Sequence, residues 1–466
     1  MATALIRNGT ILTDAGRVAA DVFIEDGIIT RVGQGLAPQA DTVLDASGRY
    51  VMPGGIDAHT HLDMPAGDIT STDDFETGTI AAAHGGTTTV IDFATPEPGE
   101  SLLAALDTWQ AKAAGKAVVD YGFHMVLRDF GERTASEVRL LGDREGITSF
   151  KMFMAYPGRL MADDGAIVGA MRGTRDQGGL VMVHAEDGRA IEVLIAEALR
   201  RGDTAPKFHA LTRPSRGEGE AVARAIALAE MARAPVFIVH LSSAEALEAV
   251  RAGRRRGVAV LAETCPQYLC LSDAEYERPD FEAAKFVMSP PLRPAAHQEA
   301  LWRGLAARDL DTVGTDHCPF GFSDPPHKQR GRDDFSKIPN GAPGIETRLM
   351  LLWDEGVRTG RITPERFVEI TAAAPAKIFG LWPRKGTIAE GSDADIVLWD
   401  PDASVTISAS THHMRVDFSV YEGRTVTGVP DAVLSRGELI VDRGAFVGRK
   451  GRGRFLSRGA AGAASA

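Results

Sequence analysis

Four histidines, one lysine and one aspartate stand at or near the ends of short apolar runs in this 466-residue sequence. His59 and His61 close the run GGIDAHTH and form a His-x-His pair. Residues i and i+2 of a strand point to the same side, so these two imidazoles can hold one cation. The other four residues are Lys151, His184, His240 and Asp316. Imidazole and carboxylate ligands suit divalent transition metals, so the set predicts a metal site.

Each of these residues alone has an ordinary structural explanation. A single histidine that ends a buried strand is more often a hydrogen-bonded core residue than a ligand, and a strand lysine usually reaches the surface. The combination of all six is what favours a metal site. Other histidines lack such a position, and we expect a structural role for them; they include His84, His124, His209, His317, His412 and His413.

Lys151 needs its own explanation, because an ammonium group has no lone pair for a metal. Its neighbours Phe150, Met152 and Phe153 are apolar, and burial among such side chains lowers the pKa of a lysine. A neutral amine can add carbon dioxide and become a carbamate, whose two oxygens could bridge two cations. We therefore expect two divalent ions, zinc before manganese, cobalt or iron, and carbon dioxide bound as a lysine carbamate.

The segments that carry these residues predict a barrel. Eight apolar runs alternate with stretches of helical periodicity, and eight such units indicate a parallel sheet closed on itself. Enzymes with this fold place their catalytic groups at the carboxyl ends of the strands, which is where the six residues fall. The runs are GGIDAHTH, TTTVIDF, DYGFHMV, ITSFKMF, LVMVHA, VFIVHL, VAVLAE and DTVGTDH.

The two ends of the chain have a different, β-rich pattern. Alternating segments fill the first 52 residues, with hairpin signals at Asn8-Gly9 and Asp26-Gly27, and similar segments return near residue 386. The predicted fold class is therefore α/β: a distorted (β/α)8 TIM barrel with a small composite β-sandwich formed from both ends. The predicted boundaries are 1–52 and 380–447 for the sandwich, 53–379 for the barrel and 448–466 for a C-terminal tail.

Composition narrows the class of protein. The formal net charge of −12 argues against a nucleic-acid partner, which usually needs a basic face. We find no secretory signal and no apolar run of membrane-spanning length, so we expect no membrane partner. The three cysteines form no C-x-x-C pair, and we expect a reduced, cytoplasmic protein.

Several motifs give the chain a specific resemblance. It resembles the cyclic amidohydrolases, and most closely the dihydropyrimidinases, whose bacterial members include D-hydantoinases. The resemblance covers nearly the whole chain and rests on GGIDAHTHLD, GGTTTVIDFATP, SFKMFMAY, VHAED, FIVHLSS, AETCPQYL, SPPLR, GTDHCPF, IPNGAPGIETR and THHMRVDFSVYEG. It implies a composite sandwich, a carbamylated lysine and a homotetramer or homodimer, with the GRGRFL tail often reaching a neighbouring subunit.

The resemblance also implies roles for single residues. His59, His61 and Asp316 correspond to the ligands of one metal, His184 and His240 to those of the other, and Lys151 to the bridge between them. The positions that match the family's substrate-recognition residues are Tyr156, Ser289 and Asn340.

The expected reaction is hydrolytic ring opening of cyclic ureides, that is 5,6-dihydropyrimidines and 5-monosubstituted hydantoins, to N-carbamoyl amino acids. A metal-bridging hydroxide would attack, Asp316 would shuttle the proton, and Tyr156 would stabilise the oxyanion. Dihydroorotases carry an arginine where this chain has Asp63, and an acid there would repel an anionic substrate. Allantoinase-like or other cyclic amide hydrolysis, and a non-catalytic scaffold role, are the alternatives.

Overall fold

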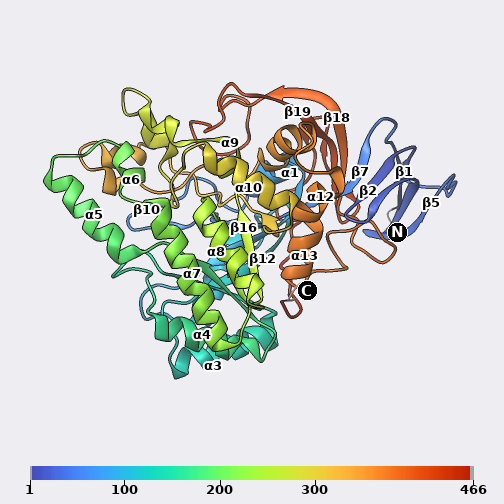
Figure 1. Ribbon diagram of the computed structural model, residues 1–466. Helices are drawn as coiled ribbons and strands as arrows, with labels where there is room; N and C mark the ends of the chain where they lie inside the picture. Colours follow the sequence, from blue (N-terminus) through green and yellow to red (C-terminus); the bar gives the residue numbers. More distant parts are fainter. Residues whose placement is uncertain (1–2, 462–466) are drawn as a thin grey trace.

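A parallel barrel forms the centre of the molecule in the computed structural model, which describes residues 3–461 (Figure 1). The sheet order is β17-β16-β15-β14-β13-β12-β11-β8, with parallel pairing throughout. Its strands are β8 (Gly55–Thr60), β11 (Thr87–Ala94), β12 (Asp120–Val126), β13 (Ser149–Phe153), β14 (Leu180–His184), β15 (Val236–Ile238), β16 (Val260–Thr264) and β17 (Thr312–Val313).

The barrel closes through the segment that follows β17. Thr60 and His317 form a parallel bridge. On either side of it, the Asp316 amide donates to the His59 carbonyl and the His61 amide donates to the His317 carbonyl, both at 2.9 Å. Each of the eight predicted apolar runs overlaps one barrel strand, so the fold class is confirmed. The predicted metal ligands His59, His61 and Asp316 therefore lie where the barrel closes.

Helices on the outside of the barrel cover the strands, as the helical periodicity predicts. The α-helices are α1 (Thr77–His84), α2 (Leu102–Ala113), α3 (Glu132–Leu140), α4 (Asp164–Arg175), α5 (Gly188–Arg200), α6 (Lys207–Leu211), α7 (Ser215–Ala232), α8 (Ala244–Arg255), α9 (Pro266–Cys270), α10 (Ala296–Ala306), α11 (Arg348–Leu352), α12 (Pro364–Val368) and α13 (Ala374–Ile378). In α7, Val222, Ile226 and Ala229 share one face at helical spacing and are fully buried. This face packs toward the strands and toward α8.

Two further sheets combine strands from both ends of the chain. The four-stranded sheet has the order β5-β4-β1-β6, and the seven-stranded sheet has the order β21-β20-β19-β18-β7-β2-β3. In Figure 1 the blue N-terminal strands lie beside the orange C-terminal ones. The strands are β1 (Thr3–Arg7), β2 (Thr10–Thr13), β3 (Gly16–Ala19), β4 (Asp21–Glu25), β5 (Ile28–Gly33), β6 (Thr42–Asp45), β7 (Tyr50–Pro53), β18 (Ile396–Thr406), β19 (Thr425–Ser435), β20 (Glu438–Asp442) and β21 (Ala445–Phe446).

The sheets share a small core of their own, in which Ile6, Val22 and Ile396 are nearly fully buried. It is separate from the main core of the barrel. A composite β domain made from both chain ends is therefore present. The residue boundaries given above remain predictions.

One of the two hairpin predictions is wrong. Asp26 and Gly27 form the two-residue turn between the antiparallel strands β4 and β5, as predicted. At Asn8-Gly9 the chain instead passes from β1 in one sheet to β2 in the other. The reason is local packing: Asn8 donates to the carboxylates of Asp21 and Asp45, which lie in strands β4 and β6, and a Cβ at Gly9 would lie 2.4 Å from Val51.

The C-terminal segment runs along the barrel of its own chain. The Leu456 amide donates to the Tyr121 carbonyl at 2.7 Å, and the Ala461 amide donates to the Gly178 carbonyl at 2.8 Å. The side chain of Leu456 belongs to a buried cluster that also contains strand residues of the barrel. The GRGRFL motif therefore contacts its own barrel. The last five residues of the predicted tail, 462–466, lie outside the described part.

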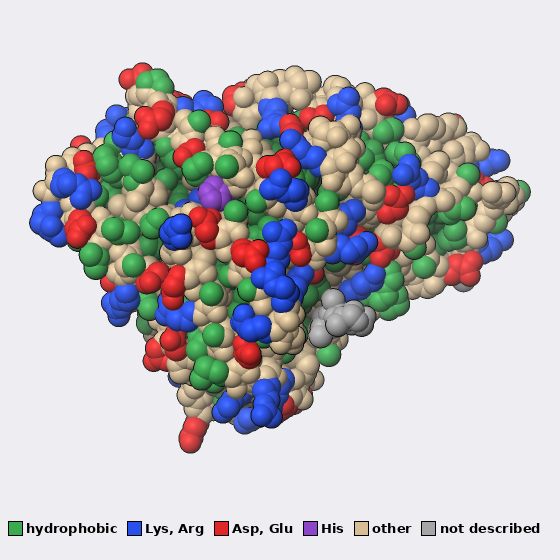
Figure 2. All heavy atoms as spheres, in the orientation of Figure 1, with side chains coloured by type: hydrophobic (Ala, Val, Ile, Leu, Met, Phe, Trp, Pro, Cys, Tyr) green, Lys and Arg blue, Asp and Glu red, His purple; other side chains and the backbone are tan. Residues whose placement is uncertain are grey.

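Among residues 3–461, no helix has both the length and the apolar character needed to cross a membrane. On the face shown in Figure 2, basic and acidic side chains lie interspersed.

Candidate metal centre and substrate cavity

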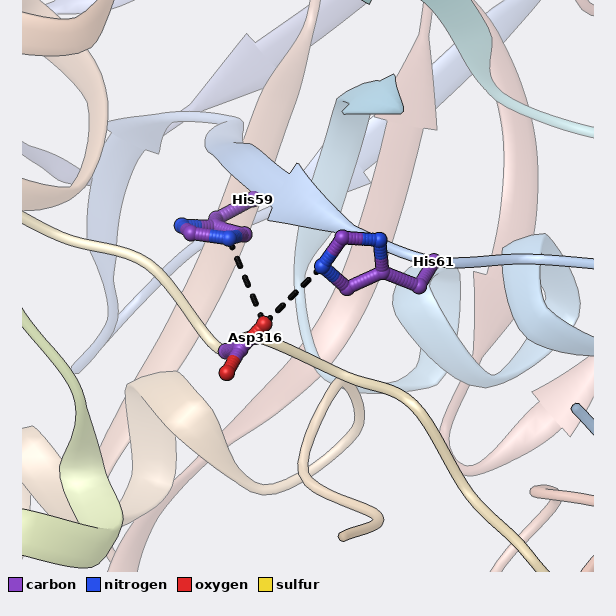
Figure 3. A group of neighbouring side chains, drawn as sticks. All are labelled: His59, His61 and Asp316. Atoms are coloured by element: carbon purple, nitrogen blue, oxygen red, sulfur yellow. Dashed lines mark hydrogen bonds and ion pairs between the residues drawn. The ribbon is translucent and has the colours of Figure 1, made fainter. Parts of the chain in front are cut away.

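His59, His61 and Asp316 converge at the closure of the barrel (Figure 3). His59 is in β8, His61 follows that strand, and Asp316 follows β17. His59 Nε2 lies 3.2 Å from Asp316 Oδ1, and His61 Nε2 lies 3.0 Å from the same oxygen. One ligand atom from each residue lies within 4.8 Å of the others. Three ligand atoms gathered at this spacing can hold one divalent cation.

His184 and His240 lie beside this group. The ring of His240 is 5.4 Å from that of His59 and 4.6 Å from that of His184, between centroids. Both side chains are nearly fully buried, and His240 Nδ1 is a buried nitrogen without a hydrogen-bond partner among the described residues. Such a nitrogen is costly unless it binds something, so its position fits a metal ligand.

Lys151 lies on the barrel wall between these groups. Its side chain is 1% exposed, and its Nζ lies 5.0 and 5.1 Å from the ring centroids of Phe93 and Phe153. Burial lowers the pKa of Lys151 to about 8, although the charges of Asp316 and Glu263 oppose the shift. The amine is therefore neutral more often than an ordinary lysine, which is the condition for carbamate formation.

The residues present fit a pair of cations. Four imidazoles, one carboxylate and one lysine amine line a single cavity, although they come from strands far apart in the sequence. The structure thus brings together all six of the residues predicted as ligands. Their assignment as ligands is taken up as a proposal below.

Two buried glutamates hold the histidine rings, and the sequence analysis missed both. His59 Nδ1 lies 2.6 Å from Glu263 Oε1, and His184 Nε2 lies 2.9 Å from Glu186 Oε2. A carboxylate on the second ring nitrogen fixes the orientation and tautomer of a metal-binding histidine. A signal existed: Glu186 follows His184 by two residues, and Glu263 ends the seventh apolar run.

The charges of this centre are strongly coupled. Burial disfavours the cation of His59, but the carboxylates of Glu263 and Asp316 outweigh it and raise the pKa of His59 to about 9. Burial would raise the pKa of Asp316, yet the imidazoles of His59 and His61 hold it well below its usual range. The carboxylate of Asp316 is thus kept ionised, as a metal ligand must be.

The proposed recognition residues line the same cavity, which has a volume of about 550 Å³, and the Tyr156 ring lies 5.4 Å from that of His184 between centroids. Asn340 Nδ2 donates to Ser289 Oγ at 3.1 Å. Burial raises the pKa of Tyr156, helped by the charge of Glu186 and opposed by hydrogen bonds with Ser289 and Asn340. The Tyr156 hydroxyl therefore keeps its proton near neutral pH and can act as a donor. A cavity of this size accommodates a small ring with a substituent.

Three of the cavity residues have a left-handed backbone, with φ of 62° at Tyr156, 36° at His240 and 54° at Asp316. This conformation is unfavourable for residues other than glycine, by about 1–3 kcal/mol each. Such strain persists where the surrounding structure imposes it, and it is concentrated at functional sites.

The charge argument from Asp63 is wrong. Among residues 3–461, Asp63 is not one of those that line the cavity, and its charge acts on Lys112 instead. The cations that do line the entrance are Arg159, Arg330 and Lys337. Repulsion by Asp63 therefore gives no ground for excluding an anionic substrate.

Most of the histidines expected to be structural have structural partners, but both ring nitrogens of His412 are buried without a hydrogen-bond partner among the described residues. His124 Nε2 contacts the Ala58 carbonyl at 3.0 Å, and His209 Nε2 contacts the Met288 carbonyl at 2.8 Å. His317 Nε2 lies 3.1 Å from Asp73 Oδ2. His84 and His413 stack with ring centroids 3.3 Å apart, away from the metal centre.

Comparison with known proteins identifies the family of this chain. The chain matches the Amidohydrolase family over residues 50–440, and it belongs to that family. It is 52% identical to a D-hydantoinase of Streptomyces coelicolor, over 97% of each chain. It is 50% identical to a D-hydantoinase of Geobacillus stearothermophilus, over 99% of this chain and 98% of the other. A crystal structure of dihydropyrimidinase from Brevibacillus agri superposes with a TM-score of 0.97 at 49% identity, over 99% of each chain.

Proposed function

We propose that this protein is a cyclic amide hydrolase that opens the ring of 5,6-dihydropyrimidines and 5-monosubstituted hydantoins, with a preference for D-hydantoins. The observation that carries the proposal is that the six predicted ligands line one cavity together with Tyr156, Ser289 and Asn340. Relatives that cover nearly the whole chain are named D-hydantoinase, which supports the substrate class.

In the proposed site, His59, His61 and Asp316 would hold one divalent ion, His184 and His240 would hold the other, and Lys151, as its carbamate, would supply negative charge to both. Zinc is the expected metal, because imidazole and carboxylate ligands suit it. When bound, such ions lower the pKa of water toward neutrality and polarise the substrate carbonyl.

The side chains then divide the remaining work. Water adds across the ring amide, so that its oxygen joins the carbonyl carbon and one of its protons reaches the ring nitrogen as the C–N bond breaks. Asp316 takes that proton from the attacking water and delivers it to the nitrogen. The Tyr156 hydroxyl donates to the carbonyl oxygen as negative charge develops there. Main-chain groups at Ser289 and Asn340 hold the imide edge.

A substrate panel on metal-reconstituted protein tests the proposal. It contains dihydrouracil, dihydrothymine, allantoin and both enantiomers of several 5-monosubstituted hydantoins, which are followed by loss of ring absorbance, and a linear amide, which is followed by release of its amine. We expect ring opening of the dihydropyrimidines and hydantoins, faster for the D-enantiomers, and none after metal removal. Turnover of allantoin alone would favour the allantoinase-like alternative. Two bound ions with no turnover of any compound would reject the proposed activity.

Metal analysis addresses the scaffold alternative, which requires that the ligand set no longer holds ions. We expect two ions per chain. For assembly we propose a homotetramer or homodimer on the basis of the family resemblance, and light scattering in solution tests it.

A further inference from the structure

Lys328 is a buried lysine to which the proposed reaction gives no role. It begins the short 3-10 helix Lys328–Gly331, and its side chain is 0% exposed. Burial lowers the pKa of Lys328 to about 7, although the nearby Cys318 opposes the shift. A cation in such a place is costly unless its donors are all satisfied.

Three main-chain carbonyls satisfy it. Lys328 Nζ donates to the carbonyl oxygens of Val287 at 2.8 Å, Pro339 at 2.7 Å and Gly341 at 2.8 Å. An ammonium group has three donors, and all three are used. Without the cation, three carbonyl dipoles would point at one buried spot with no donor between them, which is unfavourable.

The three carbonyls belong to the segments that carry the proposed recognition residues. Val287 precedes Ser289 by two residues, and Pro339 and Gly341 lie on either side of Asn340. The Gly341 amide also donates to the Val287 carbonyl at 3.1 Å. On the opposite side, a Cβ at Gly341 would lie 2.2 Å from the Cys318 carbonyl oxygen. The Asn340 segment is thus held between the Ser289 segment and the strand end that carries Asp316.

We infer that Lys328 is a positioning residue for substrate binding, which joins the two recognition segments and sets the orientation of their main-chain groups. This inference rests on the proposed function. Substrate held through main-chain groups is sensitive to the backbone position, and a displacement near 1 Å can cost about 100-fold in rate. Arginine would not replace the lysine, because its planar donors do not match three converging carbonyls.

Lys385 provides a matched control. It too is a nearly fully buried lysine, but its ammonium contacts Asp120 at 2.9 Å and Asp395 at 2.6 Å, near the C-terminal strands. It is not one of the residues that line the substrate cavity. Removal of either lysine should lower stability, whereas only removal of Lys328 should weaken substrate binding.

The experiment compares Lys328→Met and Lys385→Met with the wild-type protein, all loaded with metal. For Lys328→Met we expect two bound ions, kcat within a few-fold of wild type, and KM raised about 10- to 100-fold. Amide hydrogen exchange should become faster in both segments, 287–291 and 338–342. Unchanged exchange there would contradict the proposed role of Lys328 in joining the two segments. For Lys385→Met we expect a lower Tm with unchanged KM.

If Lys328→Met does not fold, Lys328→Gln is the second variant, since its amide retains two of the donors and should give a smaller rise in KM. An unchanged KM in the folded variant, with a loss of Tm like that of Lys385→Met, would reduce Lys328 to a stabilising residue. Hydrogen exchange needs no turnover. It therefore tests whether Lys328 joins the two recognition segments even if the wild-type protein fails to open any ureide ring.

Discussion

Two sets of residues line the cavity, the six proposed ligands (the metal half) and Tyr156, Ser289 and Asn340 (the recognition half), and they are built in different ways. In the metal half, every predicted ligand lies in a barrel strand or within a few residues of one, and hydrogen bonds at the closure of the barrel fix the positions of His59, His61 and Asp316. In the recognition half, Tyr156, Ser289 and Asn340 come from loops that hydrogen bonds and one buried lysine hold together. Under the proposed function, metal binding therefore depends on the identity of side chains, whereas the hold of Ser289 and Asn340 on the substrate depends on the position of the backbone.

The largest effect should follow from Lys151→Ala, which removes the proposed bridge from the metal half. We expect loss of two-ion binding and of measurable turnover, because the histidines alone leave the cations without shared negative charge. Metal content per chain and ring-opening rate measure this. Lys377→Ala, at an exposed lysine paired with Asp14, should behave as wild type. Full turnover with two ions in Lys151→Ala would refute the carbamate.

Tyr156→Phe should lower kcat about 10- to 1000-fold, the range expected when one oxyanion donor is lost. Metal content should stay the same, because the Tyr156 hydroxyl belongs to the recognition half. Steady-state kinetics on the best hydantoin provide the measurement, with Tyr121→Phe in strand β12 as the matched loss of a hydroxyl. A wild-type kcat would remove Tyr156 from the mechanism.

Glu263→Gln should lower metal affinity about 10-fold, toward the weaker end of the effect of outer-sphere partners. The amide retains an acceptor for His59 Nδ1 but loses the charge that makes the imidazole a stronger ligand. Competition with a chromophoric chelator gives the affinity. If the affinity is unchanged, the contact of 2.6 Å between the two side chains has only a packing role.

The smallest effect should come from Asn340→Ala. Loss of its hydrogen bond to Ser289 removes about 1 kcal/mol, which corresponds to about a fivefold rise in KM. The effect is small because the recognition half uses the main chain, which this variant keeps and Lys328 still holds. A loss as large as that of Lys328→Met would mean that the side chain, and not the backbone, binds the substrate.

Part of this site follows directly from sequence patterns. A period of two places His59 and His61 on one side of a strand, and parallel strands bring their carboxyl ends to one mouth of a barrel. The same reasoning predicted the eight strand segments, because buried parallel strands are nearly continuous apolar runs. Glu263 ends one of those runs, so its place at the mouth of the barrel could be predicted, but the sequence does not say which side chain it contacts there.

The amino-acid sequence by itself determined the fold class, the six residues of the proposed metal centre and the family, since these depend on periodicity, strand direction and residue type. Only the tertiary structure decided which carbonyls surround Lys328 and that the charge of Asp63 acts on Lys112. It also decided that the chain passes from one sheet to another at Asn8-Gly9. The physical reason is that these contacts join segments distant along the chain, and their partners are set by the packing of loops, which local patterns do not encode.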